Sequence, residues 1–277
     1  LTVACAFALA SSSGAFDPSK DMLIAQFDCK PDADDVHAQA ALGCMLVHSD
    51  LAGINYLVVL GAYGIQGGEY IDTRPLAELA FGQEGFDWTD ANSSWNGSRN
   101  LIADRAEDVL NNGGQVWVQE AGQSDLTRDW VRRLRNNKGF SQAQTQDYII
   151  VVQHSLWNED HTSPNDLTYV QQNTTYIKIA DGNYSNSTPD YDVSKTKWLN
   201  KALDSDNPNA VAQLLWGVAD AIIWDHWNTY PNEWQNPNIA GGGVDFSDCV
   251  ENWYIFDIGS SAGNVRKFWK RYVTNAP

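Results

Sequence analysis

Basic residues, long apolar runs and cofactor motifs are scarce in this sequence, and each shortage excludes a class of protein. The 277 residues include 18 Lys and Arg against 35 Asp and Glu, which gives a formal charge of −17. Proteins that bind DNA, RNA or anionic lipids through phosphates need a basic face, so we expect no nucleic-acid partner. After the N-terminal segment no run of about 18 uncharged apolar residues occurs, so we expect no membrane span. Solubility explains most of the negative charge.

Cysteine is too rare for disulfides to hold the fold together. Nucleotide-binding motifs are also missing. Cys5 lies in the N-terminal segment, and Cys29, Cys44 and Cys249 allow at most one disulfide. No CxxC pair indicates a zinc site. The chain has no GxxxxGK[ST] and no GxGxxG after an apolar run, which argues against nucleotide cofactors.

The first residues are apolar or small and read LTVACAFALASSSG. This composition is typical of the later part of a secretory signal peptide, so we interpret residues 1–16 as a signal-peptide remnant. The protein is then expected to be secreted or periplasmic. Two alternatives are a buried N-terminal strand and lipid attachment at Cys5.

Apolar runs alternate with helical patterns along the rest of the chain. The runs predict strands at residues 22–27, 54–60, 116–118, 148–153 and 176–179. Helical spacing predicts helices at residues 34–47, 99–110, 126–134 and 211–223, and leaves the type of 250–258 open. Strands that are apolar on both faces predict an α/β fold, with a mostly parallel sheet and helices on both faces. No long low-complexity linker interrupts residues 17–277, so we expect them to form a single domain.

Four acids follow the first predicted strand within eight residues: Asp28, Asp32, Asp34 and Asp35. Two carboxylates about 4 Å apart repel by roughly 4 kcal/mol at an effective dielectric near 20. Four that converge need a cation, raised pKa values or the positive end of a helix. Carboxylate oxygens are ligands for Ca²⁺. The alternative is capping of the following helix by Asp32 or Asp34, with the other acids in solvent.

The strand–DxxxDxDD–helix arrangement, with VVLGAYG after it, resembles the nucleoside hydrolase-like superfamily. It fits a secreted bacterial branch that is often labelled cellulose-binding or of unknown function. The resemblance covers about the first 150 residues well and implies the fold of that superfamily. Its members often associate, so oligomers are an open expectation.

The resemblance also implies a calcium ion and a glycosidic substrate. The implied metal ligands are Asp28, Asp34, Asp35 and, late in the chain, Asp248; the late ligand could instead be Asp245, Asp220 or Asp225. Either Asp32 or Asp28 is the implied base that takes a proton from water. Lys30 stands where nucleoside hydrolases place an acid, and could instead supply a fixed cation that weakens or replaces metal binding.

Polar and aromatic residues near the later strands are candidates for binding the substrate. Trp157, Asn158 and Glu159 follow the fourth predicted strand, and Asn183 follows the fifth. The resemblance implies that Asn and Glu side chains contact sugar hydroxyls there; the alternative is an ordinary polar loop. Glu120 and Gln123 are expected to support the site.

A tryptophan-rich segment lies between residues 214 and 234, and its rings could form one wall of a saccharide cleft or simply pack in the core. His226 in this segment is a candidate acid for the leaving group. We therefore expect a secreted hydrolase that cleaves an N- or O-glycosidic bond of a nucleoside or saccharide with calcium-bound water. The alternatives are a noncatalytic carbohydrate-binding protein and a calcium-stabilised structural domain.

Overall fold

The structure is a computed structural model that describes residues 14–183, 191–192 and 197–275. Residues 1–13 of the expected signal peptide lie outside this part. No helix within it is long and apolar enough to cross a membrane.

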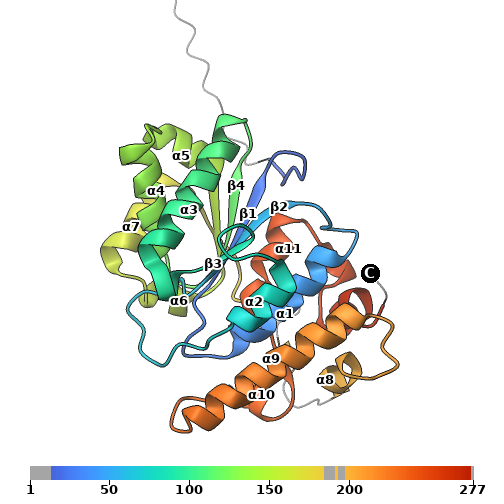
Figure 1. The fold of residues 1–277 in the computed structure, drawn as a ribbon. Coiled ribbons are helices and arrows are strands. Elements are labelled where there is room, and N and C mark those ends of the chain that lie inside the picture. The colour runs from blue at the N-terminus through green and yellow to red at the C-terminus, as the bar shows by residue number, and fades with distance from the viewer. Residues whose placement is uncertain (1–13, 184–190, 193–196, 276–277) are drawn as a thin grey trace, which may run out of the picture.

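A six-stranded sheet with only parallel pairs forms the centre of the molecule (Figure 1). The strand order is β3-β2-β1-β4-β5-β6. The bounds are β1 Met22–Phe27, β2 Asn55–Leu60, β3 Trp88–Asp90, β4 Val116–Ala121, β5 Ile149–Gln153 and β6 Thr175–Lys178. The chain order reverses between β1 and β4, and open α/β sheets bind ligands beyond the carboxyl ends of the strands at such a point.

Helices cover both faces of the sheet, which confirms the predicted α/β fold (Figure 1). One layer consists of α3 (Ala91–Asn111), α4 (Asp125–Asn137), α5 (Gln142–Tyr148) and α7 (Pro164–Asn173). The other contains α1 (Asp34–Val47), α2 (Arg74–Phe81), α9 (Ala210–Thr229) and α11 (Glu251–Ile255). Shorter elements are α6 (Leu156–Asp160), β7 (Tyr191–Asp192), α8 (Lys197–Ala202), α10 (Pro237–Ala240), β8 (Val244–Asp245), η1 (Ser247–Cys249), η2 (Gly259–Ser261), α12 (Val265–Phe268) and η3 (Trp269–Val273).

Alternate side chains of β1 enter two separate apolar cores. Leu23 and Phe27 pack in the core on the α1 side, whereas Met22 and Ile24 pack in the core on the α3 and α4 side. A strand buried on both faces is mostly apolar, and the polar side chain of Gln26 in β1 is buried with a hydrogen-bond partner, because its Nε2 donates to Thr127 Oγ1. Cys29, Cys44 and Cys249 are buried and form no disulfide.

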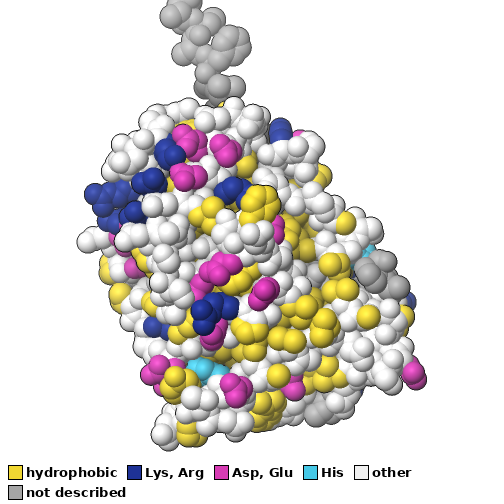
Figure 2. Space-filling model, viewed as in Figure 1, with side chains coloured by type: hydrophobic (Ala, Val, Ile, Leu, Met, Phe, Trp, Pro, Cys, Tyr) yellow, Lys and Arg dark blue, Asp and Glu magenta, His cyan; other side chains and the backbone are white. Residues whose placement is uncertain are grey.

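Apolar side chains gather on the outer surface over α2 and α9 (Figure 2). Leu79 on α2 and Leu214 on α9 are both exposed. Such a surface is where association between chains would be sought, and the oligomer expectation stays a prediction.

Candidate functional site

A pocket of about 460 Å³ opens at the carboxyl ends of the central strands. Its walls come from the loop between β1 and α1 with the start of α1, the turn after β5 with α6, the loop after β6, and two segments late in the chain. The lining residues are Asp28, Lys30, Pro31, Asp32, Asp34, His154, Ser155, Trp157, Asn158, Asn183, Trp234 and Asp248. Several sequence-predicted site residues, far apart in the chain, therefore lie around one cavity at the reversal of the strand order.

The loop after β1 holds its acids through hydrogen bonds from the backbone. Asp28 Oδ1 accepts from the Lys30 amide at 2.8 Å, and Asp34 Oδ1 accepts from the Asp35 amide at 2.9 Å. Asp35 Oδ2 accepts from the Cys29 amide, and Cys29 has a positive φ of 58°. Ala33 is the N-cap of α1, and no side chain caps this helix. Helix capping is therefore wrong as an account of these acids.

Burial and mutual repulsion raise the pKa values of the pocket carboxyls. Desolvation raises the pKa of Asp28 to about 6. Desolvation, followed by the charge of Asp245, raises the pKa of Asp32 to about 7. Desolvation, then the charge of Asp248, raises the pKa of Asp34 well above its usual range, and the pKa of Asp248 itself is raised mainly by burial. Protons or a cation must therefore offset the charge of this cluster.

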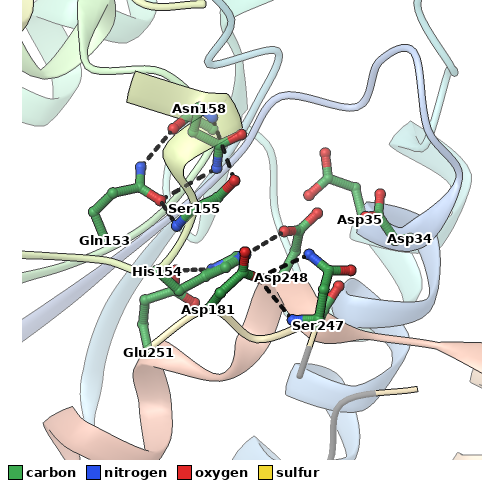
Figure 3. Close-up of polar contacts among 12 residues, drawn as sticks. Asp34, Asp35, Gln153, His154, Ser155, Asn158, Asp181, Ser247, Asp248 and Glu251 are labelled. Atoms are coloured by element: carbon green, nitrogen blue, oxygen red, sulfur yellow. Dashed lines mark hydrogen bonds and ion pairs between the residues drawn. The ribbon is translucent and has the colours of Figure 1, made fainter. Parts of the chain in front are cut away.

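The donor chemistry of this cluster fits a hard cation such as Ca²⁺. Asp35 is buried, its Oδ1 has no hydrogen-bond partner in the described chain, and desolvation and then Asp28 raise its pKa. In Figure 3 the side chains of Asp34 and Asp35 lie beside that of Asp248, which comes from the far end of the chain. Within the described ranges, however, no three His, Cys, Asp or Glu side chains are already arranged to hold a metal ion. The ligand types fit calcium, and their carboxylates would have to reorient around it.

Asp248 is the late acid that lines the pocket. Asp245 instead accepts hydrogen bonds from Asn236 Nδ2 at 2.9 Å and Ser247 Oγ at 3.0 Å. On α9, Asp220 accepts from Trp224 Nε1, and neither Asp220 nor Asp225 is among the lining residues.

The middle of the chain contributes amide side chains. Asn158 is buried at the pocket wall, and Gln123 Nε2 donates to both Asn158 Oδ1 (3.3 Å) and Asp28 Oδ2 (2.9 Å). Asn183, in the loop after β6, also lines the pocket. Glu159 does not line it, because its carboxylate pairs with Lys178 at 2.9 Å and accepts from the Tyr176 hydroxyl.

Two exposed indole rings border the opening of the pocket. Trp157 is 42% exposed and stacks on His161, with ring centroids 3.9 Å apart. Trp234 is 54% exposed. Both line a cavity whose other lining residues, apart from Pro31, are polar, and an indole ring can stack on the apolar face of a sugar or a base.

The remaining residues of the tryptophan-rich segment lie elsewhere. Trp216 and Trp227 are buried in the core, as expected if these rings serve packing. His226 is buried near Tyr230, at a ring separation of 5.0 Å, and is not among the lining residues. Burial lowers the pKa of His226. The structure does not bring this histidine to the pocket.

Three contacts near the site were not expected from the sequence. His154 Nδ1 lies 2.6 Å from Glu251 Oε1, and both side chains are buried (Figure 3). Asn236 Nδ2 bridges Asp32 Oδ2 (3.2 Å) and Asp245 Oδ2 (2.9 Å). One feature of the sequence could have indicated the role of Glu251: it is an acid within the apolar segment 250–258. Acids are rarely buried unless they have a buried partner.

Glu120, at the carboxyl end of β4, is fully buried. Ser124 Oγ donates to its Oε2 at 2.7 Å, and desolvation raises the pKa of Glu120 to about 7. It therefore lies close to the strand edge without lining the pocket.

No family model matches the chain, and a comparison with curated proteins gives no match.

Proposed function

We propose that this pocket binds a saccharide or nucleoside and hydrolyses its glycosidic bond. The observation that carries the proposal is the meeting of Asp28, Asp32, Asp34 and Asp248 in one cavity bordered by exposed indole rings. A purely structural acidic cluster would need no such opening. The resemblance of the acidic loop to the nucleoside hydrolase-like superfamily agrees with this assignment, and the composition of the first 16 residues supports secretion.

The residues of the chain supply most of the proposed machinery. Asp32 takes a proton from the attacking water, because a carboxyl with a pKa near 7 can act as a base around neutral pH. The water oxygen bonds to the anomeric carbon as the glycosidic bond breaks, and the leaving group takes up a proton from solvent at the pocket opening. Trp157 and Trp234 stack on the ligand, while Asn158 and Asn183 bind its hydroxyls.

Calcium is the proposed cofactor, held by Asp28, Asp34, Asp35 and Asp248. When bound, it would supply a Lewis acid that orients the sugar diol and the water. The chain's own contribution is to bring these four carboxylates together from two distant segments and to shield them from bulk water.

A second function from another class is noncatalytic carbohydrate binding. Lys30, which replaces an acid of the related hydrolases and lines the pocket, favours it. In that case the indole rings and amides bind an oligosaccharide, and no bond is cleaved.

A panel of oligosaccharides and nucleosides, assayed with calcium and with a chelator, separates the two functions. Release of a free sugar that requires calcium supports hydrolysis. Binding of an oligosaccharide by calorimetry with no product at any time supports the binding protein. If no compound binds or is cleaved, both functions are excluded for the tested classes.

A further inference from the structure

Three side chains in contact form a series that leads from the α11 helix to the pocket. Glu251 Oε1 lies 2.6 Å from His154 Nδ1, and His154 Nε2 lies 3.5 Å from Asp248 Oδ1. The side chains of Glu251 and His154 are 0% and 1% exposed, whereas 12% of the Asp248 side chain is exposed. Figure 3 shows these three side chains in series. The series starts at two buried side chains and ends at Asp248, which lines the pocket.

The two inner members are poorly explained as contributors to stability. A carboxyl and an imidazole that are buried together lose their hydration. Well-packed apolar side chains of similar size can often replace such a pair without lowering the stability of the folded protein. Glu251 Oε2 also has no hydrogen-bond partner within the described residues, so part of its desolvation is not offset. A role in orienting another group accounts better for their presence.

The geometry specifies which group that is. His154 directly follows β5, and Glu251 begins α11, so each is fixed by a packed element. The contact with Glu251 fixes the orientation of the imidazole ring and directs Nε2 toward Asp248.

The backbone of Asp248 is held as well. Gln119 Nε2 donates to its carbonyl oxygen at 2.7 Å, and Gln119 Oε1 accepts from Asn252 Nδ2 at 2.8 Å. Asp248 is thus restrained at both its main chain and its carboxylate, although it lies in a short 3-10 turn.

We propose that His154 and Glu251 are positioning residues that hold the Asp248 carboxylate in place as a calcium ligand. This inference rests on the proposed function, because it assumes that Asp248 binds the ion. Carboxylates and carbonyls behind a ligand commonly set its orientation, and their loss lowers metal affinity about 10- to 100-fold.

Calcium titration by calorimetry on the full chain tests the inference. The variants are His154→Gln, Glu251→Gln, Asp248→Asn and the pairs Glu251→Gln/Asp248→Asn and His154→Gln/Glu251→Gln. We expect each positioning variant to raise the Kd about 10- to 100-fold. Because the three residues act in series, Glu251→Gln should change the Kd less than about twofold when Asp248 is already Asn.

Thr127→Val is the matched control. It removes a buried hydrogen bond of 2.6 Å, from Gln26 Nε2 to Thr127 Oγ1, on the face of the sheet covered by α4. It should lower the melting temperature and leave the calcium Kd unchanged. A Glu251→Gln protein with wild-type Kd and a lowered melting temperature would overturn the positioning role while leaving the calcium proposal intact. Absence of calcium binding by the wild-type chain would overturn both, and the two failures are thereby distinguished.

Discussion

The Lys30 ammonium lies 3.9 Å from the centroid of the Tyr63 ring. Within the part of the chain that the structure describes, this ammonium forms no ion pair with a carboxylate, although it lines a pocket with four aspartates. A cation over an aromatic face is stabilised by the ring's quadrupole without using a carboxylate oxygen. The expectation that Lys30 could take the place of the metal is thus not supported by direct contact, and its charge acts on the cluster only from a distance.

Replacing Lys30 should therefore strengthen calcium binding. Lys30→Met removes a repelling charge, and Lys30→Asp also adds a carboxylate. We expect the calcium Kd to fall in the order wild type, Met, Asp, with about a tenfold decrease for Asp, because affinity at oxygen-ligand sites rises with ligand charge. Calorimetric titration measures this order. An unchanged Kd in Lys30→Asp would show that this position does not act on the ion.

Asp32→Asn should abolish turnover while the ligand still binds. Loss of a general base typically costs about 10²- to 10⁴-fold in rate. We expect kcat to fall by this amount, with the Kd for the same ligand within about threefold of wild type. Asp108→Asn, at an exposed acid on α3, is the control and should behave as wild type. Equal loss of kcat and binding in Asp32→Asn would assign this residue to the binding surface instead.

Removal of either indole at the pocket opening should weaken ligand binding. Trp157→Ala and Trp234→Ala each lose stacking area on the ligand, and we expect affinity to fall about tenfold, or about 1.4 kcal/mol. Trp224→Ala is the matched control because this ring is similarly exposed but lies on α9, outside the lining. If the control loses as much affinity as the two pocket variants, the indoles do not define the binding site.

The titration of Glu120 should lower the free energy of unfolding as the pH rises. Burial raises its pKa from the ordinary value of 4.5 to about 7. Between these two values the unfolded chain releases the proton while the folded chain keeps it, so the stabilisation present below pH 4.5 is lost as the pH rises through 7. The difference corresponds to on the order of 3 kcal/mol in the free energy of unfolding.

Glu120→Gln removes this titration. Urea unfolding at pH 5 and pH 8 should show a smaller decrease of stability in the variant than in the wild type. Glu78→Gln, at an exposed acid on α2, should leave the decrease unchanged. The same decrease in Glu120→Gln as in the wild type would mean that Glu120 titrates normally in the folded protein.

The sequence predicts the central strands well because each contains a run of apolar residues, although β1 and β4 also carry buried polar side chains. The predicted bounds 22–27 and 34–47 agree with β1 and α1, and residues 99–110, 126–134 and 211–223 lie within α3, α4 and α9. The three-residue β3 has too little apolar length to be predicted. The α5 helix is not predicted either, although its capping box of Ser141 and Gln144 is a readable signal.

The site is only partly readable from the sequence. The loop acids and Asn158 could be placed because they follow buried strands, whose carboxyl ends share one edge of the sheet. The pairing of His154 with Glu251 joins residues 97 positions apart and depends on how α11 packs, which no local pattern encodes. Glu159 illustrates the reverse problem, since Lys178 on the neighbouring β6 pairs with it away from the cavity.

The amide of Asn236, which bridges Asp32 and Asp245, lies two residues after the indole of Trp234. Residues 234–236 therefore contribute Trp234 to the lining of the cavity and a hydrogen bond from Asn236 to Asp32. A ligand that shifts Trp234 and displaces Asn236 with it would also alter the hydrogen bonding of Asp32. By thermodynamic reciprocity, a change in the protonation of Asp32 would alter affinity at the rim by the same factor. If Asn236 moves with Trp234, the proposed recognition of the ligand and the proposed proton transfer at Asp32 become linked equilibria.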